Sequence, residues 1–137
     1  MFKQLYSPLV LKHVRRPHNM GEIKKPDGVA TEGNKRCGDI MKMFIKVKTK
    51  NGVEYLDNVK FQTLGCGAAI ATSSMATTLI KGKPLVEAEK LTNQSIVASL
   101  GGLSPAKLHC SVLAAEALQK AIQNYRKKPK LDINIHL

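Results

Sequence analysis

Acidic residues are scarce in this sequence of 137 amino acids. It has 22 lysines and arginines but only 10 aspartates and glutamates, which gives a formal net charge of +12 at pH 7. Such an excess favours contact with nucleic acid, anionic lipid or an acidic protein. Aromatic residues are few as well, since only three phenylalanines and three tyrosines could stack on bases. We therefore favour a dispersed, solvated positive surface over a dedicated nucleic-acid site.

Cysteine is rarer still. The three cysteines, Cys37, Cys66 and Cys110, are an odd number and lie 29 and 44 residues apart. That spacing suits neither a disulfide framework nor a compact zinc finger of paired Cys-x-x-Cys motifs. Reduced thiols fit better, and the first residues show neither an apolar signal core nor a transit peptide rich in Arg and Ser. We therefore expect a cytoplasmic protein.

Charged residues are missing from one stretch, residues 61–80, which is as long as a membrane span. This stretch contains several threonines and serines together with Gly65 and Gly67. Such a composition predicts a turn followed by a buried helix, so we expect no contact with lipid.

A chain of this length fits one domain, so we expect residues 1–137 to form a single unit with a basic tail from about residue 126. Residues 5–16 predict an opening helix that starts at Ser7-Pro8 and ends at Pro17. The segment 19–38 is rich in Gly, Lys and Asn, which predicts a loop with a short extended piece near 29–32.

Apolar residues then alternate with lysines over 41–48, which predicts a half-buried strand. Asn51-Gly52 predicts a hairpin turn, and residues 53–64 predict the returning strand. Helices are predicted at 68–80, 85–90 and 93–100. The clearest prediction is a long final helix with Ser104 as its N-cap, Pro105 at its first position and an apolar stripe. The expected class is α+β, with about three antiparallel strands packed against several helices.

Each cysteine falls at a junction between predicted elements, where functional sites collect. Cys37 precedes a strand, Cys66 lies between a strand and a helix, and Cys110 is in the early turns of the final helix. A buried cysteine can simply be a small core residue. However, three thiolates with one imidazole or carboxylate could hold zinc, or supply the terminal ligands of a two-iron cluster. The spacing alone does not choose between these sites.

The residues around the cysteines resemble the IscU/NifU-type iron-sulfur cluster assembly scaffolds. The resemblance covers nearly the whole chain, and it implies a SufE/NifU-like fold. It rests on four stretches in the same order as in that family: Arg16-Pro17-His18-Asn19-Met20-Gly21, Cys37-Gly38-Asp39, Gly65-Cys66-Gly67-Ala68-Ala69-Ile70-Ala71-Thr72-Ser73-Ser74 and Lys107-Leu108-His109-Cys110-Ser111.

The resemblance implies that Cys37, Cys66 and Cys110 accept sulfur from a cysteine desulfurase and hold a transient 2Fe-2S cluster. Asp39 and His109 are then the candidates for the fourth ligand. Because a carboxylate or an imidazole binds iron less tightly than a thiolate, either residue would make the cluster easier to release. The implied protein is an assembly scaffold and carrier, not an enzyme. Its implied partners are the desulfurase, apo iron-sulfur proteins and a ferredoxin, and Zn²⁺ could occupy the same ligands in the isolated protein.

Leu103-Ser104-Pro105-Ala106-Lys107 aligns with the family's Leu-Pro-Pro-Val-Lys motif, which binds a heat-shock chaperone, and differs from it at two of five positions. The resemblance thus implies contacts of Leu103, Pro105 and Lys107 with the chaperone and its co-chaperone. Ser104-Pro105 could instead simply cap the helix.

An alternative function is that of a zinc-bound sulfur acceptor that stimulates a desulfurase. The SufU branch of the family resembles a sulfur transferase of this zinc-dependent kind. That branch carries an insertion between its second and third cysteines and has no histidine before the third. Here 44 residues leave no room for the insertion, and His109 is present. Both features favour the scaffold. A basic nucleic-acid binder is the third hypothesis.

Overall fold

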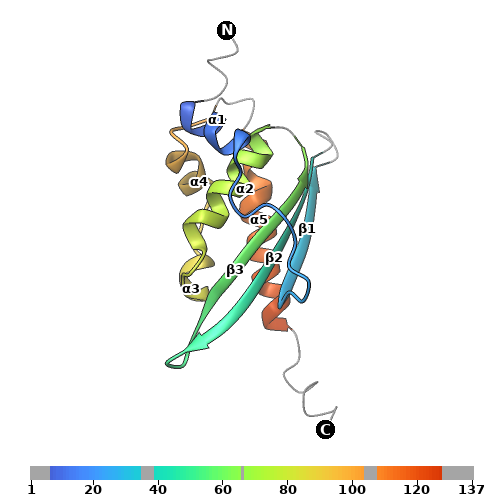
Figure 1. Ribbon diagram of the computed structural model, residues 1–137, viewed down its shortest axis with the longest axis vertical. Helices are drawn as coiled ribbons and strands as arrows, with labels where there is room; N and C mark the ends of the chain where they lie inside the picture. Colours follow the sequence, from blue (N-terminus) through green and yellow to red (C-terminus); the bar gives the residue numbers. More distant parts are fainter. Residues whose placement is uncertain (1–6, 35–38, 66, 104–107, 128–137) are drawn as a thin grey trace.

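The computed structural model describes residues 7–34, 39–65, 67–103 and 108–127, without the side chains of residues 34, 39 and 108–111. These residues form a three-stranded antiparallel sheet and five helices, as expected for an α+β protein (Figure 1). In chain order the elements are α1 (Pro8–Arg15), β1 (Gly28–Asn34), β2 (Asp39–Lys50), β3 (Val53–Leu64), α2 (Gly67–Ile80), α3 (Leu85–Ala88), α4 (Asn93–Ser99) and α5 (Leu108–Lys127).

The predicted hairpin is confirmed as β2 and β3. Asn51 and Gly52 both have positive φ angles, 53° and 79°, which matches the twist of a tight hairpin turn. Alternation along β2 buries Met41, Met43 and Ile45 against the helices, and leaves the intervening side chains on the outer face. The sheet order is β1-β2-β3.

The loop predicted over residues 19–38 is partly wrong, because β1 is a seven-residue strand within it and not a short extended piece. Its residues pair with β2 from Gly28 opposite Ile45 to Asn34 opposite Asp39. The strand contains several small residues, such as glycine and alanine, that have a low propensity for β structure. Its extent therefore depends on pairing with β2 and packing against α5.

Helices α2 and α5 form the layer that covers the inner face of the sheet (Figure 1). Helix α2 is rich in small residues and is buried on nearly every side, so it can pack closely on β3 and α5. The stripe predicted for α5 is confirmed, since Leu113, Ala117, Leu118, Ala121 and Ile122 are all buried. The predicted cap, Ser104, lies outside the described residues. No described helix has both the length and the apolar character that crossing a bilayer requires.

Residues 19–21 cover the free edge of β3. The backbone N–H of Gly21 donates to the carbonyl of Phe61 over 2.8 Å, and the N–H of Phe61 donates to the carbonyl of Asn19 over 3.0 Å. Asn19 has a φ of 63°, and its side-chain amide donates to Thr77 Oγ1 over 3.1 Å. This segment therefore connects β3 to α2 and protects a strand edge.

Helix α1 begins at the predicted cap, where Ser7 accepts a hydrogen bond from the backbone N–H of Val10. Its buried histidine, His13, faces α2, and the two atoms His13 Nδ1 and Ser74 Oγ are 2.6 Å apart. Ser74 Oγ also accepts the backbone N–H of His18. Burial lowers the pKa of His13, and the neighbouring charges of His18 and Lys12 lower it further.

This environment predicts that His13 makes the stability depend on pH. Because its pKa is lower in the folded state, the unfolded chain takes up a proton first as the pH falls below about 6.5. We expect the free energy of unfolding to decrease there by at most about 1.4 kcal/mol per pH unit from this group.

Urea titrations from pH 7 to pH 5 should show a shallower decrease in the free energy of unfolding for His13→Asn. Thr78→Ala, which removes a nearby hydroxyl without removing a titrating group, should keep the wild-type slope; equal slopes in wild type and His13→Asn would contradict the prediction.

Candidate metal centre

The strands bring two cysteine-bearing junctions to one end of the sheet. Asn34 pairs with Asp39, so residues 35–38, which include Cys37, connect the ends of β1 and β2. Ile40 pairs with Leu64, so the end of β3 lies beside the start of β2. Cys66 follows within two residues of Leu64 and directly precedes α2. The register of the sheet thus brings these two junctions together.

Helix α5 brings the third junction to the same end. The Asn124 side chain donates to the carbonyl of Val29 over 2.8 Å, and four residues earlier Lys120 Nζ lies 3.3 Å from Glu32 Oε1. The helix therefore runs antiparallel to β1. Its first turn, which contains His109 and Cys110, points towards the Asn34 end of the strand (Figure 1).

Two helix N-termini meet at this end, because α2 starts after β3 ends and α5 starts there as well (Figure 1). Each helix N-terminus carries a partial positive charge and unpaired backbone N–H groups. Both features stabilise thiolates relative to thiols. The end at which the three junctions converge is thus electrostatically suited to anionic sulfur.

The side chains of the predicted ligands lie outside the described residues. Asp39 opens β2, and His109 and Cys110 are in the first turn of α5, but only their backbone is described. Cys37 and Cys66 lie wholly outside. Among the side chains that are described, no three His, Cys, Asp or Glu come close enough to hold a metal ion. The ligand set therefore stays a prediction. So does the chaperone contact, since Pro105 and Lys107 are also outside and Leu103 packs half-buried against the core.

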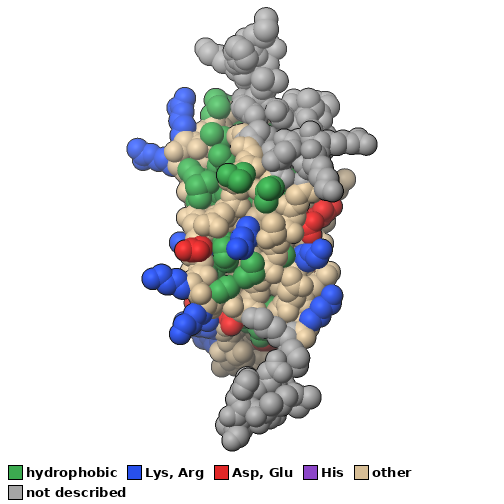
Figure 2. Space-filling model, turned by 90° about the vertical axis from the view of Figure 1, so that its right-hand side faces the viewer, with side chains coloured by type: hydrophobic (Ala, Val, Ile, Leu, Met, Phe, Trp, Pro, Cys, Tyr) green, Lys and Arg blue, Asp and Glu red, His purple; other side chains and the backbone are tan. Residues whose placement is uncertain are grey.

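The structure has an apolar groove next to these junctions, which the sequence analysis did not predict. It has a volume of about 530 Å³ and lies on the outer face of the sheet, with exposed hydrophobic side chains from Met20, Ile40 and Leu64 in its wall. Figure 2 shows hydrophobic side chains gathered on the upper part of one face of the molecule. The alternation in β2 could have revealed Ile40, because it is out of phase with the buried Met41 and Met43.

Comparison with known proteins decides the family. The NifU-like N-terminal domain family matches residues 5–132, which is nearly the whole chain and includes all three junctions. The chain belongs to this family. The resemblance of its cysteine motifs to the IscU/NifU type is thereby confirmed.

Relatives within the NifU-like family are similar over most of their length. One is the iron-sulfur cluster assembly scaffold protein IscU 1 of Archaeoglobus fulgidus, which is 50% identical over 129 residues, 93% of this chain and 82% of the relative. Another is the iron-sulfur cluster assembly scaffold protein IscU of Aquifex aeolicus, 46% identical over 123 residues, 90% of this chain and 77% of the relative. The fold agrees as well. The crystal structure of the N-terminal part of a nitrogen-fixing NifU-like protein from Brucella abortus superposes with a TM-score of 0.69 at 19% identity and covers 93% of this chain and 99% of that one.

Proposed function

We propose that this NifU-like protein is a scaffold on which an iron-sulfur cluster is assembled from iron and desulfurase-derived sulfur and then transferred to apo-proteins. The observation that carries the proposal is the convergence of three cysteine-bearing junctions at one end of the fold. Relatives at up to 50% identity that are named iron-sulfur cluster assembly scaffold proteins support it. The cluster is cargo that passes through the protein, so this is an assembly and delivery function.

Cys37, Cys66 and Cys110 supply three thiolates from three different junctions, and thiolates are the usual ligands of such clusters. Asp39 or His109 completes the set as a weaker fourth ligand. A 2Fe-2S cluster needs four terminal ligands and matches this count. A cluster held by three strong ligands and one weak one is more readily released than one held by four thiolates, as a carrier requires. Zn²⁺ suits the same Cys and His ligands and would compete for them.

Partner proteins must reach the cysteines both to deliver sulfur and to receive the cluster. The groove lined by Met20, Ile40 and Leu64 offers exposed apolar surface beside the junctions. Apolar patches of this kind on soluble proteins commonly mark sites of protein contact. A partner that binds there would be adjacent to the cluster.

The test is anaerobic reconstitution with ferrous iron, cysteine and a cysteine desulfurase, followed by visible absorption and Mössbauer spectroscopy. The loaded protein is then mixed with an apo-ferredoxin. We expect a two-iron cluster that forms on the protein and leaves for the acceptor. A stimulated desulfurase with no cluster, together with tightly retained zinc, would contradict the scaffold. That result would instead indicate a zinc-bound sulfur acceptor.

A further inference from the structure

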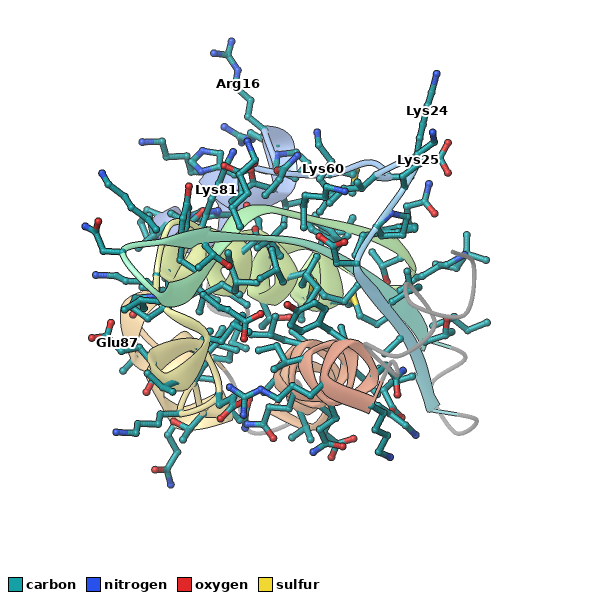
Figure 3. All side chains as sticks on the ribbon, turned by 90° about the horizontal axis from the view of Figure 1, so that it is seen from below. Arg16, Lys24, Lys25, Lys60, Lys81 and Glu87 are labelled. Atoms are coloured by element: carbon teal, nitrogen blue, oxygen red, sulfur yellow. The ribbon has the colours of Figure 1, made fainter. Side chains whose placement is uncertain are left out.

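Positive side chains gather on one side of the molecule. Figure 3 shows Arg16, Lys24, Lys25, Lys60 and Lys81 projecting from the same side, opposite α5, whereas Glu87 on α3 lies elsewhere. We call these five residues the basic face. They come from four separate segments: the end of α1, the connection from α1 to β1, the strand β3, and the turn after α2. The tertiary structure therefore collects charges that are spread over 66 residues of sequence.

Within the part of the chain that the structure describes, the basic face has no acidic partners of its own. The ion pairs found there join Lys46 to Asp27, Lys48 to Asp57, Lys120 to Glu32 and Arg126 to Glu89, and none includes a residue of the face. Glu22 is the exposed acid nearest in sequence to Lys24 and Lys25, and it forms no ion pair with them. Cations on one side of a molecule that form no ion pairs of their own raise the positive potential there, so an acidic partner would be attracted to this side.

The backbone beneath the face is held in place. Residues 19–21 are hydrogen-bonded to Phe61, one residue after Lys60, and a Cβ placed on Gly21 would lie 3.9 Å from Lys60 Nζ. The backbone carbonyl of Lys25 accepts a hydrogen bond from Lys46 over 3.0 Å. These contacts fix the segments that carry the charges relative to one another. A partner would thus meet a largely preformed arrangement.

The chemistry of the face favours protein carboxylates over nucleic acid or membrane. Four of its five cations are lysines, which act as point charges and lack the planar fork with which arginine binds phosphate bidentately. The phenylalanines that the structure describes, Phe44 and Phe61, are buried and cannot stack on bases. Between its cations the face carries one exposed large apolar residue, Met20, whereas a membrane-binding surface needs an extended apolar face.

We propose that an acidic protein docks on the basic face through a surface rich in Asp and Glu. Lys24 and Lys25 precede the start of β1, and Lys81 follows the end of α2, so these three lie at the ends of their elements remote from the cysteine junctions. A protein bound there leaves the junctions uncovered. The face would thus hold a partner beside the scaffold while the cysteine end remains open.

Binding of a fluorescein-labelled oligoglutamate peptide to the full chain, followed by fluorescence anisotropy, tests the proposal. The test variant is Lys24→Glu with Lys60→Glu, and the control is Lys90→Glu with Lys127→Glu, exposed residues at the end of α3 and on α5. Both variants change the net charge equally. We expect the affinity to fall about tenfold in the test variant and less than about twofold in the control, with added salt weakening the wild-type complex.

Equal losses in the two variants would overturn the proposal, because net charge alone would then explain the binding. The wild type should also be tested with oligothymidine and with phosphatidylserine vesicles. If either binds more tightly than the peptide and loses affinity in the test variant to the same extent, the proposal is overturned in favour of nucleic acid or membrane. Thermal melting and chemical reconstitution with iron and sulfide check each variant separately. A test variant that loads a cluster normally but fails to bind the peptide confirms docking. If neither the wild type nor the variants load a cluster, that result counts against the proposed scaffold function and not against docking.

Discussion

Replacing any one of Cys37, Cys66 and Cys110 with serine should reduce cluster loading to background. Each residue comes from a different junction, so no neighbouring thiol can take over its place. A serine hydroxyl is a hard ligand that is not deprotonated at neutral pH, and it substitutes poorly for a soft thiolate on iron. The measurement is the visible absorption and the iron and sulfide content after anaerobic reconstitution of each variant.

Gln62→Ser is a suitable control for the cysteine variants. Gln62 is exposed near the end of β3, so its replacement changes the same end of the molecule without removing a ligand. This control should load as the wild type does when iron and sulfide are supplied without a desulfurase, because Gln62 lines the groove proposed for partner contact. A cysteine variant that retains wild-type loading and the same Mössbauer parameters would exclude that residue from the ligand set.

Gly28→Ala should be strongly destabilising, because a Cβ at this position would meet tighter contacts than at any other glycine whose surroundings are described. A Cβ at Gly28 would lie 2.4 Å from the backbone oxygen of Ala121 and 3.0 Å from Ile45 Cγ1. The nearer atom belongs to the backbone of α5 and cannot rotate away, so β1 and α5 must separate. We expect unfolding to become easier by about 2 to 3 kcal/mol, as for overpacked cores. Urea denaturation should show this as a lower midpoint, and thermal melting as a Tm lower by roughly 10 °C.

Gly33→Ala provides the matched control for this change. Gly33 lies on the same strand but is exposed, and alternation along β1 places it on the face opposite Gly28, so its added methyl group points away from α5. Its midpoint should stay within about 0.5 kcal/mol of the wild type, as for most surface substitutions. Equal losses in the two variants would show that glycine is needed for the conformation of β1 and not for its contact with α5.

Several elements could be predicted because their signals are local. Asn51 and Gly52 tolerate positive φ angles and therefore favour a tight turn. At the start of α1, the Ser7 side chain accepts a backbone hydrogen bond and Pro8 restrains the backbone. The apolar stripe of α5 follows the helical period, and its buried residues are those expected. In each case, residues within a few positions of one another carry the whole signal.

Other features depend on contacts between distant residues and escaped prediction. The extent of β1 depends on β2 and α5, because its small residues do not specify a strand alone. The helical period places His13 on the apolar face of α1, but its hydrogen bond to Ser74 joins residues that lie 61 positions apart in the chain. Similarly, the strand-like role of residues 19–21 follows from hydrogen bonds to Phe61 and could not be read from Asn and Gly, which favour loops.

The sequence by itself determined the family, the hairpin, the helices and the identity of the candidate ligands, because motifs and periodic patterns are encoded in neighbouring residues. Only the tertiary structure decided that the three cysteine junctions meet at one end and that the cations from Arg16 to Lys81 share one side. Strand register and the direction of α5 set both outcomes. These depend on packing between segments that are far apart in the chain, and the sequence pattern of any one segment carries no information about that packing.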